Sequence, residues 1–125
     1  MQKRDTTTSI AELQELITNF RKARNWDIKY SDPYDIAAAL SVEAAEILEL
    51  LLWQKNADVK QLIAQEPKLK EKLANEIADV LAFILVLSDS LNIDLSDVFL
   101  QKMATNADKY PIIEGESKPR KRWLE

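Results

Sequence analysis

The 125-residue sequence contains no cysteine and no histidine. Without cysteine the chain forms no disulfide and offers no thiolate nucleophile. Without histidine it lacks the imidazole that serves most often as a general base, and nearly every zinc or di-iron site is excluded as well. Any metal that its side chains bind must accept oxygen ligands, which favours Mg²⁺ and leaves Mn²⁺ as an alternative.

Glycine and proline are also scarce, with one and four residues respectively, which argues against strands joined by tight turns and favours long helices. The longest apolar run, residues 80–87, is too short to span a bilayer. The first residues lack the apolar core of a signal peptide. A net charge of −4 gives no general attraction for nucleic acid. We therefore expect a cytoplasmic protein of one domain, with neither a membrane nor a nucleic acid as partner.

Local signals predict four long helices. Ser9 and Glu12 form a capping box that opens the first helix, and Asp32 followed by Pro33 opens the second. Asn92 is a suitable residue for the end of the third helix. The expected helices run from residue 9 to about 25, 33 to about 54, 67 to about 91 and 94 to 110, with one short helix near 59–64. The predicted fold is all-α and of the four-helix-bundle type, with a domain over 1–110 and an extended tail over 111–125.

Two segments, residues 47–53 and 80–87, are apolar on every side of their helices. In a small single bundle one side of each helix would face water, whereas a helix that is apolar all round is usually buried all round. We therefore expect a homo-oligomer, either a dimer or a tetramer. A central helix buried within a monomer is the alternative.

Carboxylates interrupt the apolar stripes of the second and third helices. In "LSVEAAEILELLLW" Glu43 and Glu46 lie about 60° apart on the stripe that should be buried, and "LANEIADVLAF" repeats this spacing with Glu76 and Asp79. Antiparallel packing of the two helices would bring the four acids together. Because unpaired buried carboxylates are very costly, one or more divalent cations are expected between them.

Two other interpretations of these acids remain. The acids could pair with lysine or arginine across helices, or they could sit at a solvated edge. One such pair on a helix is weak evidence, but two pairs, each inside an apolar stripe, favour a metal. Hard cations with open water positions suit substrates that carry phosphate.

The fourth helix carries a polar face near its end. Lys102, Asn106, Lys109 and Tyr110 follow the spacing i, i+4, i+7 and i+8, and each offers a hydrogen-bond donor. Such a face could bind phosphate oxygens and a sugar hydroxyl. The alternative is a solvated helix end on which the helix dipole favours cations.

These motifs together resemble the MazG-like all-α nucleoside triphosphate pyrophosphohydrolases, and within them the dCTP pyrophosphatase branch. The resemblance covers about residues 16–110 and rests on the two acidic helices, on "KMATNADKYP" and on the tryptophan segment "FRKARNW". It implies that Glu43, Glu46, Glu76 and Asp79 bind Mg²⁺. It also implies that Trp26 and Trp53 form the base pocket and that the nucleotide is contacted by Lys102, Asn106 and Tyr110.

The resemblance further implies hydrolysis of the α–β phosphate bond of a nucleoside triphosphate, with release of a monophosphate and pyrophosphate. We expect dCTP or a modified dCTP as substrate. A related hydrolase acting on dUTP or noncanonical triphosphates is one alternative, and a non-catalytic helical adaptor is another. Which group activates the water, a carboxylate or the metal, stays open at this point. The tryptophans have a second interpretation too, as packing residues at helix ends.

Overall fold

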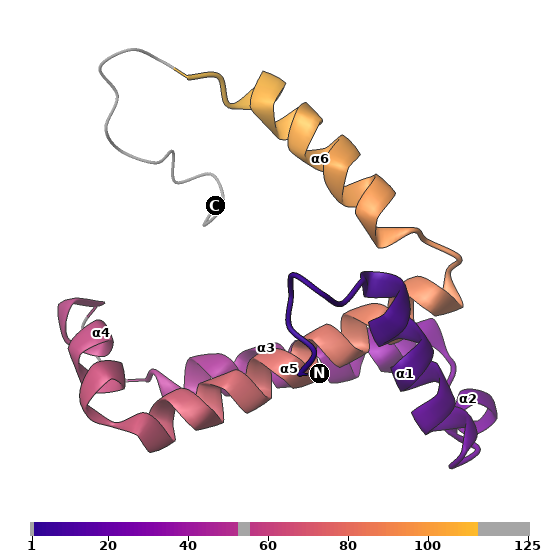
Figure 1. The fold of residues 1–125 in the computed structure, drawn as a ribbon, viewed down its shortest axis with the longest axis horizontal. Helices are drawn as coiled ribbons and strands as arrows, with labels where there is room; N and C mark the ends of the chain where they lie inside the picture. Colours follow the sequence, from indigo (N-terminus) through magenta and orange to yellow (C-terminus); the bar gives the residue numbers. More distant parts are fainter. Residues whose placement is uncertain (1, 53–55, 113–125) are drawn as a thin grey trace. The chain divides into compact units, whose positions relative to one another are not determined.

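The computed structural model describes residues 2–52 and 56–112, and these residues contain helices and no strand. The all-α prediction is therefore confirmed for the described chain. Its elements, in chain order, are α1 (Ile10–Lys22), α2 (Trp26–Lys29), α3 (Pro33–Leu50), α4 (Asn56–Gln65), α5 (Pro67–Ser90) and α6 (Leu95–Lys109) (Figure 1). None of the described helices is both long and apolar enough to cross a membrane.

An antiparallel pair of long helices, α3 and α5, forms the centre of the first unit (Figure 1). The short helix α4 joins them at one end, and α1 packs against α5 near the other. The buried apolar residues along this pair include Ile36 of α3 and Leu73, Leu85 and Val86 of α5. This hairpin fixes which residues of α3 and α5 face each other, and it therefore positions the acidic residues of both helices.

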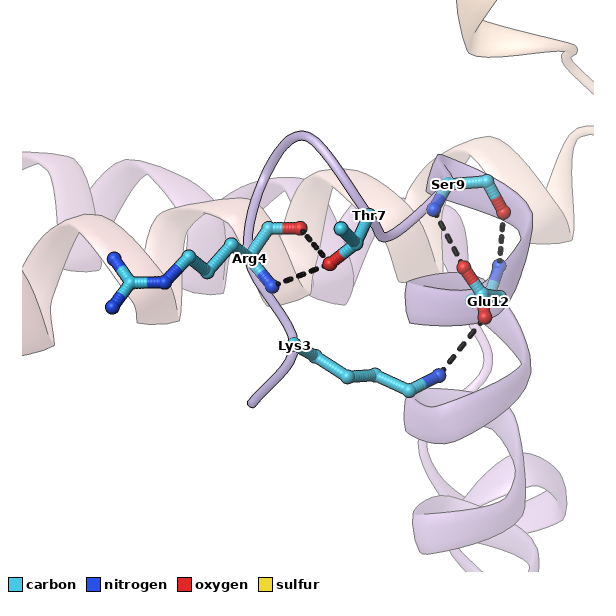
Figure 2. Close-up of polar contacts among 5 residues, drawn as sticks. All are labelled: Lys3, Arg4, Thr7, Ser9 and Glu12. Carbon is cyan, nitrogen blue, oxygen red and sulfur yellow. Dashed lines mark hydrogen bonds and ion pairs between the residues drawn. The ribbon is translucent and has the colours of Figure 1, made fainter. Parts of the chain in front are cut away.

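The capping box predicted at the start of α1 is confirmed (Figure 2). The Glu12 backbone N–H donates to Ser9 Oγ at 3.1 Å, and the Ser9 N–H donates to Glu12 Oε2 at 2.7 Å. Lys3 Nζ donates to the other carboxylate oxygen of Glu12 at 2.9 Å. Because these contacts satisfy donors that a helix start leaves unpaired, α1 begins where the sequence predicts.

The sequence prediction was wrong about the end of this helix. Helix α1 ends at Lys22 instead of continuing to residue 25, and a separate four-residue helix, α2, follows. Asn25, between the two helices, has a left-handed backbone (φ 56°) that breaks the helical path. Asparagine adopts this conformation more readily than most residues. An isolated helix of this length is unstable, so tertiary contacts must hold α2 in place.

The remaining helix starts follow the local signals. Pro33 is the first residue of α3, and Asp32 accepts a hydrogen bond from the Tyr34 N–H at 2.8 Å. Helix α3 ends at Leu50, earlier than predicted, and α4 is longer than the short helix expected near 59–64. After α5, Asn92 has φ 53°, and the Ile93 N–H donates to Ser88 O at 2.8 Å, which terminates the helix as a Schellman motif.

The chain divides into two compact units, one ending at Ile93 and the other starting at Asp94. The second unit contains α6, which Asp94 caps by accepting a hydrogen bond from the Asp97 N–H at 2.9 Å. The domain predicted over residues 1–110 stays a prediction, and the tail predicted over 111–125 lies outside the described residues from residue 113 onward.

Candidate functional site

Three of the four predicted acids converge between α3 and α5. Glu43, Glu46 and Glu76 each offer one carboxylate oxygen, and these oxygens lie within 4.8 Å of one another. All three side chains are half-buried. The i, i+3 spacing places Glu43 and Glu46 on one side of α3, and the antiparallel hairpin brings Glu76 opposite them. Asp79 is close enough for its charge to act on Glu43.

The surroundings of these carboxylates raise the pKa values of two of them, Glu76 and Glu43. A hydrogen bond shared with Glu46, partial burial and the charges of Glu46 and Glu43 raise the pKa of Glu76 to about 7. Burial, followed by the charges of Glu46 and Asp79, raises the pKa of Glu43. Each shift has the direction expected for carboxylates that share a site without a counter-charge.

Within residues 2–52 and 56–93, none of the four acids forms an ion pair with lysine or arginine. The Oε2 atom of Glu76 is buried, and no donor of the described chain reaches it. The alternative in which cross-helix ion pairs neutralise the acids is therefore not found in this part of the chain. A divalent cation fits the site, because it supplies positive charge to a set of oxygen ligands of the kind that Mg²⁺ prefers. The role of these residues as metal ligands stays a prediction.

The raised pKa of Glu76 predicts how the stability of the metal-free protein depends on pH. The folded state binds this proton more tightly than the unfolded state, in which the pKa has its ordinary value of 4.5. The stability that the protonated carboxyl contributes is complete below pH 4.5 and is lost as the pH rises through about 7. In EDTA, the melting temperature should fall over this range, and Glu76→Gln should reduce the fall.

The exposed acid Glu71, one turn earlier on α5, offers a matched control for this measurement. Glu71→Gln should keep the pH dependence of the wild type, because Glu71 is not part of the acidic cluster. Identical melting curves against pH for wild type and Glu76→Gln would contradict the assignment of the titration to the cluster.

A cavity of about 610 Å³ lies beside the acids. Helices α1, α2, α3 and α5 all contribute to its walls, and most of the lining side chains are apolar. The lining residues are Ile17, Phe20, Arg21, Trp26, Tyr30, Asp35, Ile36, Ala39, Asp79, Ala82, Phe83 and Val86. A concave, mainly apolar cavity with a few polar groups is typical of a small-molecule site.

Aromatic side chains form one wall of this cavity. The rings of Phe20 and Trp26 pack edge to face with centroids 5.8 Å apart, and Tyr30 packs against Trp26 at 6.4 Å. Arg21 holds this wall, since its Nη2 donates to the backbone oxygen of Trp26 at 3.1 Å and to that of Tyr30. These contacts explain how the short helix α2 keeps a defined position next to α1.

Asp79 connects the cavity with the acidic cluster. Its side chain lines the cavity, and its charge contributes to the raised pKa of Glu43. The cavity and the carboxylates are therefore neighbouring parts of one site on the α3–α5 hairpin. A ligand with an apolar ring at one end and phosphate groups at the other matches this arrangement.

Several lining residues were not predicted from the sequence, among them Phe20, Arg21, Tyr30 and Asp35. A signal for Asp35 was present, because it precedes Glu46 by eleven residues, which is about three helical turns and places both on one side of α3. The aromatic wall had no such signal. It depends on the break after α1 and on the position of α2.

The other predicted site residues are distributed as follows. Trp26 lines the cavity, whereas Trp53 lies outside the described residues. Asn106 of α6 is buried, and its Nδ2 has no acceptor among the described residues. The remaining three predicted residues of the α6 region are Lys102, Lys109 and Tyr110, and they belong to the second unit as Asn106 does. Their contact with a substrate stays a prediction.

The chain is similar to known proteins of one family. A family model described as the MazG-like family matches residues 38–123. The chain is 29% identical over 104 residues to dCTP pyrophosphatase 1 of Rattus norvegicus, which covers 83% of this chain and 60% of that protein. Human dCTP pyrophosphatase 1 is 26% identical over 113 residues, which covers 90% and 65%. The chain thus spans less than two thirds of the length of these curated relatives.

A solved structure also matches. The crystal structure of a pyrophosphatase from Archaeoglobus fulgidus has a TM-score of 0.75 and 31% sequence identity with this chain. The match covers 90% of this chain and 99% of that one. The similarity therefore extends over nearly the whole fold.

Proposed function

The chain belongs to the MazG-like family, and from this premise we propose that it hydrolyses nucleoside triphosphates to monophosphates and pyrophosphate. The observation that carries the proposal is the position of Asp79, which lines the apolar cavity and also acts on the acidic cluster. A nucleotide lying across Asp79 would place its base in the cavity and its phosphates beside the carboxylates.

Glu43, Glu46 and Glu76, with Asp79 next to them, would hold Mg²⁺ in this proposal. The cation supplies Lewis-acid chemistry by neutralising the charge that develops on phosphate oxygens. In the reaction, water adds across the P–O–P bridge between the α- and β-phosphates, and one P–O bond of this bridge breaks. The monophosphate and pyrophosphate leave, and the remaining proton of the water passes to solvent.

The residues of the cavity bind and orient the nucleoside in the same proposal. Trp26 and Phe20 offer apolar ring surface to a base, and stacking on such surfaces contributes about 1–3 kcal/mol per base. The name of the curated relatives supports dCTP, or a modified dCTP, as the substrate.

A substrate panel tests the proposal. The protein is incubated with Mg²⁺ and each nucleoside triphosphate in turn, and monophosphate and pyrophosphate are quantified by chromatography. Equal amounts of the two products, highest for dCTP, are expected. Release of orthophosphate instead would contradict cleavage between the α- and β-phosphates. If the protein prefers dUTP or a noncanonical triphosphate, that nucleotide takes the place of dCTP as the proposed substrate. No turnover of any triphosphate would favour a non-catalytic adaptor.

We also propose that two or more copies of the chain assemble through the α3–α5 hairpin. Leu48 of α3, Leu52 just after the end of α3, and Ile77 and Leu81 of α5 are 63%, 45%, 57% and 42% exposed. On a helical wheel Leu48 lies about 140° from Glu43, and Leu81 lies about 140° from Glu76. This apolar surface is directed away from the acids, and exposed patches of this kind mark interaction sites.

Sedimentation at micromolar concentration tests the assembly. The mass should be a multiple of the 14.3 kDa chain, and Leu48→Glu should lower it by placing a charge on the apolar surface. Leu16→Glu, at an equally exposed leucine of α1 outside the hairpin, serves as the control. A wild-type monomer that hydrolyses triphosphates would contradict the proposal.

A further inference from the structure

We infer that Asp35 selects among bases, favouring those that present an exocyclic amino group over those that present a carbonyl at the same position. The inference rests on the proposed nucleotide substrate and assigns a residue to its base specificity. The cavity carries three charged side chains, namely Arg21, Asp35 and Asp79. Their different surroundings leave Asp35 as the one suited to contact a base.

Two of these charged groups, those of Arg21 and Asp79, already interact with other parts of the protein. The Nη2 atom of Arg21 donates to the backbone oxygens of Trp26 and Tyr30, so the guanidinium is used to hold the aromatic wall. Asp79 lies at the acidic end of the cavity, where its charge acts on Glu43. Neither group is therefore placed to choose between bases.

Asp35 has no comparable partner. Among the described residues its carboxylate makes no hydrogen bond or ion pair, and the start of α3 is already capped by Asp32, which accepts from the Tyr34 N–H. Asp35 is exposed and lines the cavity together with apolar and aromatic side chains. A donor on a bound ligand would give Asp35 the partner that the described chain does not provide.

The distance from the acidic cluster also suits a base contact. Asp35 precedes Glu43 by eight residues, which is about 12 Å along the axis of α3. The base and the triphosphate of a nucleotide occupy opposite ends of the molecule, with the sugar between them. Asp35 is thus at the end of the cavity where the base lies when the phosphates meet the carboxylates.

The chemistry of a carboxylate gives the direction of the preference. An ionised carboxylate only accepts hydrogen bonds. Cytosine presents an amino donor at position 4, whereas uracil and thymine present a carbonyl acceptor there. Cytosine therefore gains a hydrogen bond to a charged group, while uracil brings an acceptor towards the same oxygen atoms. Because Asp35 is exposed to solvent, which competes for this contact, a preference of about tenfold is expected.

The test compares the binding of deoxycytidine and deoxyuridine to the full chain, measured by NMR titration without metal. These nucleosides differ at the position in question and carry no phosphate, so the measurement does not depend on hydrolysis. The wild type should bind deoxycytidine about tenfold more tightly. Asp35→Asn, whose amide both donates and accepts, and Asp35→Ala should reduce the ratio to about one.

Asp58→Asn provides the control, because Asp58 is an exposed acid in the first turn of α4 and does not line the cavity. It should keep the wild-type ratio. Equal binding of the two nucleosides by the wild type, no binding of deoxycytidine at millimolar concentration, or an unchanged ratio in Asp35→Asn would each overturn the inference. Selective binding without hydrolysis of any triphosphate would instead contradict the proposed function and leave the role of Asp35 standing.

Discussion

Glu46→Gln is expected to slow triphosphate hydrolysis about a thousandfold at saturating substrate. Glu46 contributes one of the three carboxylate oxygens that lie within 4.8 Å of one another. Losing a charged ligand removes about 4 kcal/mol of transition-state stabilisation, and each 1.36 kcal/mol corresponds to a factor of ten in rate. The measurement is the turnover number at a series of Mg²⁺ concentrations.

The same substitution should leave the metal-free fold intact or raise its stability, because a neutral amide relieves the repulsion among the carboxylates. Glu49→Gln is the matched control, since Glu49 is exposed on the same helix three residues further on and does not belong to the cluster. Its turnover should stay within about twofold of wild type. Wild-type turnover of Glu46→Gln at saturating Mg²⁺ would show that Glu46 is not an essential ligand.

Trp26→Ala is expected to weaken nucleotide binding by about 1–3 kcal/mol, which is a factor of roughly 5 to 150. Trp26 lines the cavity and packs between Phe20 and Tyr30, so its removal takes away the centre of the aromatic wall. Calorimetry with dCTP should show the loss, while the affinity for Mg²⁺ alone should change little.

A base-free triphosphate separates stacking from a loss of structure, because it has phosphates but no ring. Its affinity should be nearly unchanged in Trp26→Ala. Tyr34→Ala is the control, since Tyr34 is 81% exposed on α3 and is not part of the cavity. Equal losses for dCTP and the base-free triphosphate would indicate that Trp26 only packs the end of α1.

The acidic part of the site was predictable because it depends on spacing within single helices. Residues three apart on a helix share a face, whatever surrounds the helix. Glu43 with Glu46 and Glu76 with Asp79 therefore had defined directions before any packing was known, and the antiparallel hairpin was enough to make the cluster. Their pKa values were not predictable, because they depend on the burial and separation of groups from two helices.

The cavity was only partly predictable, because it lies among four helices. Trp26 was identified through the family resemblance, yet the sequence placed it beyond the end of a helix that was expected to reach residue 25. The left-handed backbone of Asn25 separates Trp26 from α1, and Arg21 donates hydrogen bonds to the backbone oxygens of Trp26 and Tyr30, which both line the cavity. Neither feature has a reliable signature in a single sequence.

The sequence by itself determined the helical class, the starts of α1, α3, α5 and α6, and the pairing of acids on each stripe. These features depend on capping groups, proline and helical periodicity, which act over a few residues. Only the tertiary structure decided the break before α2, the aromatic wall and the place of Asp35 in the cavity. These features arise where separate helices meet, so their energies depend on contacts between residues far apart in the chain.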